Sequence, residues 1–204
     1  MFRKRIQPLK LTADVLFQFK IALLDSKPAI WRCIQVRDCT LDKLHEHIQT
    51  AMGWTNSHLH QFEIESERYG DPELLDDGFD DFDCRNSTTT MIAQIVPKSD
   101  MRFAFKYKYD FGDGWEHEVL FEGCPPIEKG KKYPICLEGE RACPPEDVGG
   151  VGGYQNFLAA IADPKHEEHS SFLERCGGSF SPDKFEPKKA TREMKKGLPD
   201  WRTM

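Results

Sequence analysis

The sequence lacks the features that mark membrane or secreted proteins. Its 204 residues contain only short apolar runs, whereas a membrane-spanning helix needs about 20 consecutive apolar residues. Arg3, Lys4 and Arg5 make the start of the chain basic, but no apolar segment follows them as it does in a secretory signal. We therefore expect a cytoplasmic protein that makes no membrane contact.

Paired cysteines are also missing. The seven cysteines include no Cys-x-x-Cys pair, and structural zinc sites usually hold ligands about two to four residues apart. In a cytosolic chain the simplest state of these residues is the reduced thiol. The sequence therefore does not favour a cysteine-based zinc site.

An excess of positive charge is absent as well. The chain carries 28 Lys and Arg against 34 Asp and Glu, a net charge of −6, which excludes a protein that coats nucleic acid generally. Residues 71–83 hold seven carboxylates, which indicates an exposed loop, while both ends are basic. Phosphates or an acidic partner could contact these ends. The basic residues concerned are Arg3, Lys4, Arg5, Lys188, Lys189, Arg192, Lys195 and Lys196.

The order of predicted elements indicates an α+β fold. Alternating apolar residues predict a strand over 15–24 and a hairpin over 103–109 and 115–121, and a β-rich run over 30–36, at hairpin distance from the first strand, predicts its antiparallel partner. Helical spacing between Thr40 and Gly53 predicts one amphipathic helix, and alternation resumes over 58–65. We expect a β-grasp-like, mainly antiparallel sheet that wraps one helix, with a core over about 14–123.

The remainder of the chain is expected to complete a single domain over 1–204. Residues 124–153 are rich in proline and glycine and are predicted to form a long loop packed by its own contacts. Residues 154–162 have helical character that Asp163 and Pro164 end, and 169–175 form a second short helix. We expect residues 154–204 to be a C-terminal helical appendage.

Histidines and carboxylates form the candidate site. His58 and His60 lie two apart on a predicted strand, so their side chains should leave the same face, and His117 lies on the apolar face of the hairpin. If these strands are neighbours, the three imidazoles could bind zinc or manganese. The alternative is that they are core-edge histidines. The candidate polar cluster is His58, His60, Asp110, Asp113, His117, Glu146 and Asp147.

Other polar residues of these segments have simpler interpretations. Asp110 and Asp113 are typical turn formers, because Asp side chains accept hydrogen bonds from the backbone of such turns. His45 and His47 are separated by about 200° on a helix, cannot share one ion, and are expected to be exposed. Four glycines in 149–153 precede a helix and could let backbone amides approach an anion. We favour a rigid loop that caps the sheet, because Glu146 and Asp147 would repel phosphate.

Three segments together resemble the plasmid pRiA4b ORF-3-like family: HLHQFEI at 58–64, YKYDFGDGWEHEV at 107–119, and CLEGERACPPEDVGG at 136–150 followed by GGY at 152–154. KPAIWRCIQV at 27–36 and AMGW at 51–54 fit the same pattern, and the similarity covers roughly 17–173. The resemblance implies an association with plasmids and mobile elements but no established activity. Many relatives carry Cys where this chain has Val148, which weakens any proposal of a metal-binding or redox cysteine pair there.

The family pattern emphasises residues that overlap with the candidate cluster. They are His58, His60, Asp110, Gly112, Asp113, Trp115, His117, Cys143, Pro144, Pro145, Glu146, Asp147 and Gly150. This overlap favours a common cleft for the polar members.

Two functions follow as hypotheses. The leading one is a non-enzymatic binding or accessory module for a protein or nucleic-acid partner, because no recognised catalytic signature is present. The alternative is a metal-dependent hydrolase or nuclease that uses the histidines with a carboxylate.

Overall fold

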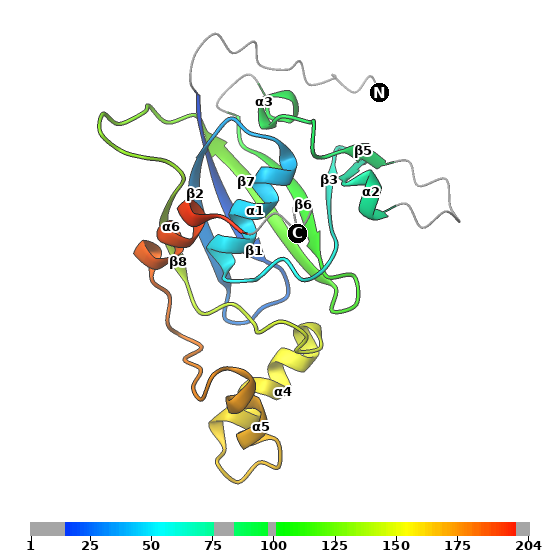
Figure 1. The fold of residues 1–204 in the computed structure, drawn as a ribbon, viewed down its shortest axis with the longest axis vertical. Coiled ribbons are helices and arrows are strands. Elements are labelled where there is room, and N and C mark those ends of the chain that lie inside the picture. Colours follow the sequence, from blue (N-terminus) through cyan, green and yellow to red (C-terminus); the bar gives the residue numbers. More distant parts are fainter. Residues whose placement is uncertain (1–14, 76–83, 98–100, 199–204) are drawn as a thin grey trace.

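The computed structural model describes residues 15–75, 84–97 and 101–198, and within them eight strands form one sheet (Figure 1). The strand order is β5-β4-β3-β6-β7-β1-β2-β8, and all neighbours are antiparallel except β4 and β5. The strands are β1 (Leu16–Leu23), β2 (Ile30–Arg37), β3 (His60–Ile64), β4 (Glu67–Gly70), β5 (Cys84–Asn86), β6 (Phe103–Tyr109), β7 (Trp115–Gly123) and β8 (Ile135–Glu140). The predicted α+β class is confirmed, while the likeness to β-grasp folds stays a prediction.

The described residues also form six helices. These are α1 (Leu41–Met52), α2 (Pro72–Leu75), α3 (Ile92–Ile95), α4 (Gly150–Ala162), α5 (His169–Arg175) and α6 (Pro187–Lys196). None of them is long and apolar enough to cross a bilayer. The basic residues Arg3, Lys4 and Arg5 and most of the acidic run 71–83 lie outside the described residues.

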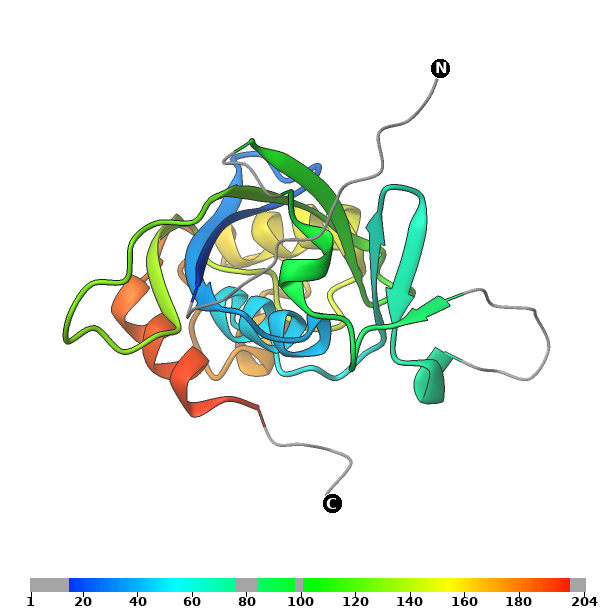
Figure 2. The same ribbon diagram turned by 90° about the horizontal axis from the view of Figure 1, so that it is seen from above.

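The core lies between the sheet and α1. The sheet curves around this helix (Figure 2), and the alternating side chains of the central strands face it. Phe19 and Ile21 of β1 and Phe121 of β7 are completely buried there. The Thr40 hydroxyl caps α1 by accepting from the Lys43 amide, and Gly53 ends it with φ of 112°. The predicted strands and helix are thereby confirmed in this region.

Two expectations about α1 and its surroundings are wrong. His45 and His47 are buried, with 3% and 6% of their surfaces exposed, because the curved sheet covers more than one stripe of α1 and α6 packs on the same helix. Residues 124–153 are also not all loop, since β8 pairs there with β2. Gly139 allows this pairing, because a Cβ at that position would lie 2.6 Å from the Trp31 carbonyl oxygen.

The C-terminal helices divide into two groups. α4 and α5 pack on one another at the end of the molecule, below the sheet in Figure 1. α6 instead returns to the sheet edge, where the Cys136 amide donates to the Thr191 hydroxyl over 3.0 Å. Part of the expected appendage is therefore integrated into the core.

A buried arginine, Arg32, joins β2 to the end of α1 and to β8. The Arg32 side chain is 1% exposed and donates to the backbone carbonyls of Ala51, Met52, Trp31, Glu140 and Arg141. These bonds use all the N–H groups of the guanidinium, so the buried cation is fully hydrogen-bonded without a carboxylate. It fixes the end of α1, and therefore the loop that follows, relative to the sheet.

Candidate metal site

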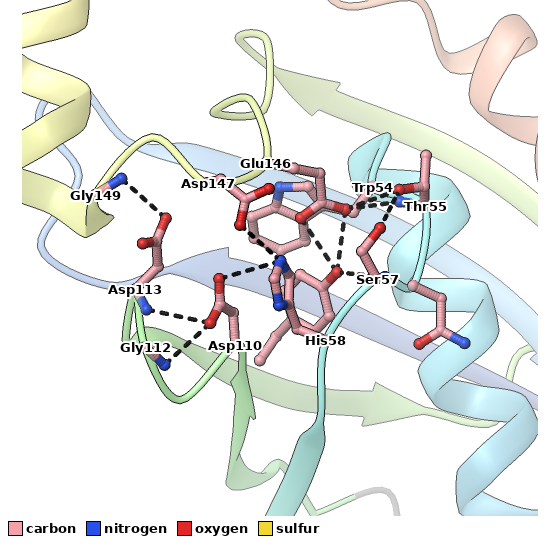
Figure 3. Close-up of polar contacts among 12 residues, drawn as sticks. Trp54, Thr55, Ser57, His58, Asp110, Gly112, Asp113, Glu146, Asp147 and Gly149 are labelled. Carbon is pink, nitrogen blue, oxygen red and sulfur yellow. Dashed lines mark hydrogen bonds and ion pairs between the residues drawn. The ribbon is translucent and has the colours of Figure 1, made fainter.

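Three segments meet at one end of the sheet (Figure 3). They are the loop 54–58 after α1, the turn 110–114 between β6 and β7, and the segment 143–149 before α4. The Trp54 indole donates to the Pro144 carbonyl oxygen over 3.0 Å, which holds the first segment to the third. The Asp110 amide donates to the Leu59 carbonyl oxygen over 2.9 Å, which holds the turn beside His58.

His58, Asp110 and Asp147 converge at this junction. The Nε2 atom of His58 lies 3.0 Å from Oδ1 of Asp147 and 3.6 Å from Oδ2 of Asp110. One ligand atom from each residue falls within 4.8 Å of the others, and among the described residues this is the one group of three potential metal ligands. Although Nε2 is close to both carboxylates, it is buried and makes no hydrogen bond with either. An imidazole nitrogen and two carboxylate oxygens are donors that zinc and manganese accept.

The turn positions Asp110. The residue is buried, its φ is 54°, and its Oδ1 accepts from the amides of Gly112 over 3.0 Å and Asp113 over 3.2 Å. The interpretation of Asp110 as a turn former is therefore confirmed for one oxygen. The other oxygen, Oδ2, faces His58 (Figure 3).

Asp113 connects the turn to α4. Its Oδ2 accepts from the Gly149 amide over 3.0 Å, so a protein carboxylate already occupies the N-terminus of this helix. Gly150 packs so closely that a Cβ on it would lie 2.3 Å from the Asp113 carbonyl oxygen. These contacts support the interpretation of the glycine-rich segment as a rigid loop rather than as an anion site.

Glu146 connects the same segment to the loop after α1. Its Oε1 accepts from the Thr55 amide over 2.9 Å and from the Tyr109 hydroxyl over 3.0 Å. The Tyr109 hydroxyl in turn accepts from the Ser57 amide. Burial raises the pKa of Tyr109 and the Glu146 carboxylate raises it further, so the phenol stays protonated and donates. Glu146 thus positions the loop of His58 and is outside the group of three ligands.

Asp147 is the exposed member of the group. Its side chain is 66% exposed, its φ is 54°, and its carbonyl oxygen accepts from Nη2 of Arg175 over 3.1 Å. Two of the three converging residues therefore hold a left-handed backbone, which is uncommon outside glycine and is often found at functional sites.

The three-histidine ligand set expected from the sequence is not assembled. β3 begins at His60, so His58 lies in the preceding bend and the alternation of the strand does not extend to it. The His60 ring stacks on that of His45 at a centroid distance of 3.5 Å. His117 is completely buried, its Nδ1 lies 3.4 Å from the Tyr107 carbonyl oxygen, and burial lowers its pKa to about 3. For His60 and His117 the core interpretation is the better one.

Sequence reasoning missed several residues that build this site. Tyr109 entered the sequence analysis only as the last residue of the predicted strand 103–109, yet its hydroxyl joins Glu146 to the loop 54–58. His45 bonds through Nδ1 to the Tyr107 hydroxyl and through Nε2 to the Asn56 side chain, both over 2.7 Å. No local pattern pointed to Arg175, because its contact lies 28 residues away in the chain.

Known proteins resemble this chain over most of its length. An uncharacterized protein named y4hQ, from Sinorhizobium fredii (strain NBRC 101917 / NGR234), is 44% identical over 165 residues, which are 79% of this chain and 81% of the relative. The crystal structure of the protein of unknown function MM3350 from Methanosarcina mazei Go1 has a TM-score of 0.74 and 32% identity, covering 87% of this chain and 98% of that one. The family model of the plasmid pRiA4b ORF-3-like protein matches residues 15–189. The chain therefore belongs to the plasmid pRiA4b ORF-3-like family.

Proposed function

We propose that this protein binds a divalent cation through His58, Asp110 and Asp147 and uses it to activate water for hydrolysis. The observation that carries the proposal is the convergence of one imidazole nitrogen and two carboxylate oxygens within 4.8 Å. Of the two functions expected from the sequence, this geometry favours the metal-dependent hydrolase or nuclease. It has one histidine ligand in place of the three that the sequence suggested.

The donor set suits catalysis better than a structural role. One nitrogen and two oxygens are ligands that zinc and manganese accept. Three protein ligands would leave positions for water and substrate, and a bound zinc ion would lower the pKa of that water to about 7. The His58 side chain is 28% exposed and that of Asp147 is 66% exposed, so the open positions face solvent.

Bonds to neighbouring groups hold each carboxylate in place. Asp110 is fixed by two turn amides, and the Asp147 backbone is fixed by Arg175. Such outer contacts typically change metal affinity by about 10- to 100-fold when they are removed. A cluster supported in this way is suited to bind an ion without rearrangement.

The binding-module hypothesis stays a prediction. Its support within the described residues is α6, where five basic side chains are exposed: Lys188, Lys189, Arg192, Lys195 and Lys196. The carboxylates of the proposed metal site are not needed for that role, so the two hypotheses concern different surfaces of the molecule.

Metal binding by untagged, chelator-treated protein tests the proposal. Calorimetric titration with Mn²⁺ or Zn²⁺ is expected to give about one equivalent, and Asp110→Asn is expected to weaken the affinity at least about 100-fold, since it removes a direct ligand. Asn preserves an oxygen acceptor for the Gly112 and Asp113 amides, so the turn stays intact. His166→Gln, outside the cluster, is the matched control and should bind metal as the wild type does.

Hydrolysis by the metal-loaded protein tests the catalytic part. p-Nitrophenyl phosphate should be cleaved by the wild type and by His166→Gln, and not by Asp110→Asn. Stoichiometry far below one for both metals would overturn the whole proposal. Full metal binding without cleavage of this ester or of p-nitrophenyl acetate would overturn the hydrolytic role and retain the metal site.

A further inference from the structure

Arg175 lies at the edge of the proposed metal site. It is the last residue of α5, and its Nη2 donates over 3.1 Å to the carbonyl oxygen of Asp147. The Asp147 carboxylate therefore supplies one oxygen to the proposed metal ligands, and the Asp147 backbone carbonyl supplies another to the guanidinium. Through this shared residue, the positive charge of Arg175 is connected to the proposed metal site.

The guanidinium has capacity for a further ligand. Its side chain is exposed, and no carboxylate of the described residues lies within ion-pair distance of it. The bond to Asp147 uses one of five N–H groups. This contrasts with Arg32, whose N–H groups are all directed to backbone carbonyls.

The charges around Arg175 favour an anionic ligand. With a divalent ion bound, the carboxylates of Asp110 and Asp147 are neutralised, and Arg175 leaves one positive charge at the open side. The other two carboxylates nearby are directed elsewhere: Asp113 accepts from the Gly149 amide, and Glu146 accepts from Thr55 and Tyr109. An approaching anion would thus meet the ion and the guanidinium together.

Building on the metal site of the proposed function, we propose that the substrate is a phosphate monoester whose phosphate bridges the ion and Arg175. The three free oxygens of a monoester are enough to place one on the ion and two on the planar fork of the guanidinium, whereas a carboxylate has only two in all. In hydrolysis, the metal-bound hydroxide would form a bond to phosphorus, the ester P–O bond would break, and the leaving alkoxide would take a proton from solvent. Arg175 would neutralise the phosphate and orient it for this attack.

Binding of inorganic phosphate to the Mn²⁺-loaded, full-length protein tests this role. Bound Mn²⁺ should accelerate ³¹P relaxation of phosphate in the wild type. Arg175→Gln is expected to weaken phosphate binding about tenfold or more, because it removes a charge-assisted contact. Because Arg175 also holds the Asp147 backbone, the Mn²⁺ affinity of each variant is measured by electron paramagnetic resonance, and phosphate binding is compared at Mn²⁺ concentrations that saturate each variant.

Two further variants and a competitor make the outcomes distinct. Arg175→Lys keeps the charge and should retain more affinity than Arg175→Gln, and Arg85→Gln, a distant exposed arginine, should behave as the wild type. Acetate at equal concentration should not displace phosphate. If Mn²⁺ binds but phosphate affinity is the same in Arg175→Gln, or if acetate competes equally, the substrate assignment is wrong and the metal site stands. If no Mn²⁺ binds, the proposed function and this inference both fall.

Discussion

His58 and His117 show how one residue type serves two opposite purposes at the same end of the sheet. His117 is completely enclosed, with the rings of Trp54 and Tyr107 at centroid distances of 5.3 and 5.2 Å. His58 lies at the rim between two carboxylates. Burial among aromatic rings disfavours the imidazolium of His117, whereas the two carboxylates beside His58 are potential ligands of a metal ion. The environment, rather than the presence of histidine, therefore decides which position suits a metal.

The backbone explains why the two residues differ. His117 lies within β7, where alternation points every second side chain into the core. His58 precedes β3 in a bend and follows the loop that Trp54 and Glu146 hold. The inward residues of a regular strand pack in the core, whereas a residue in an irregular segment at the end of the sheet can point toward other loops.

Lowering the pH should give the largest effect on stability, because it acts on the histidines that are buried in the core. Burial lowers the pKa of His117 to about 3 and that of His47 to about 4, from an ordinary value of 6.5. The unfolded chain therefore binds protons below pH 6.5 that the native chain does not, so stability falls as the pH drops from 6.5 toward 4 and is unaffected by these groups above 6.5. At pH 4 each residue should cost about 3 kcal/mol of the free energy of unfolding, which urea denaturation at pH 7 and pH 4 measures.

A variant identifies the source of this pH dependence. His117→Gln removes one titrating group, so the difference in unfolding free energy between pH 7 and pH 4 should shrink by about 3 kcal/mol, whatever the variant costs at pH 7. Equal pH dependence in His117→Gln and the wild type would show that His117 is not a neutral core residue.

The central strands and α1 could be predicted from the sequence because their hydrophobic and capping patterns are local. β1, β6 and β7 alternate clearly, and α1 has both a cap at Thr40 and a stop at Gly53. β4 and the edge strand β5 span only four and three residues, too few to show a period. β8 contains Gly139, which signals a loop in the sequence but here permits close approach to Trp31.

The candidate site could be predicted from the sequence only in part. The sequence named His58, Asp110 and Asp147, which the fold brings together, but it grouped them with His60 and His117 by assuming that the strand includes residue 58. The roles of Asp113 and Glu146 depend on long-range contacts with Gly149 and Tyr109. Such contacts leave no periodic pattern in one sequence, so the choice of ligands among the carboxylates required the fold.

Gly150→Ala should disturb the open site while sparing the buried histidines. Gly150 has φ of 66°, and its Cβ would lie 2.3 Å from the Asp113 carbonyl oxygen. Strain and overlap together should cost about 3 kcal/mol of stability and displace the turn of Asp110, lowering Mn²⁺ affinity. Thermal unfolding and metal titration measure the two effects.

The matched control for that change is Gly177→Ala. Gly177 has a similar φ of 74°, but its Cβ would meet nothing within 4 Å. It should lose about 1 kcal/mol from backbone strain alone and keep its metal affinity. If both variants behave alike, the contact between α4 and the turn does not hold the site.

Trp54→Phe should give the smallest effect. Trp54 contacts both the His117 ring and the segment that carries Asp147, and the change removes only the second of these contacts. Phe keeps an aromatic ring beside His117, while the bond from the indole to the Pro144 carbonyl oxygen is lost, at about 1 kcal/mol. Trp115→Phe controls for ring size, because the Trp115 indole nitrogen is buried with no hydrogen-bond partner among the described residues. In chemical denaturation Trp54→Phe should lose more stability than Trp115→Phe, and Mn²⁺ affinity should fall only in Trp54→Phe, because Pro144 lies in the segment that carries Asp147. Equal losses in both variants would mean that ring packing alone joins the two histidine environments.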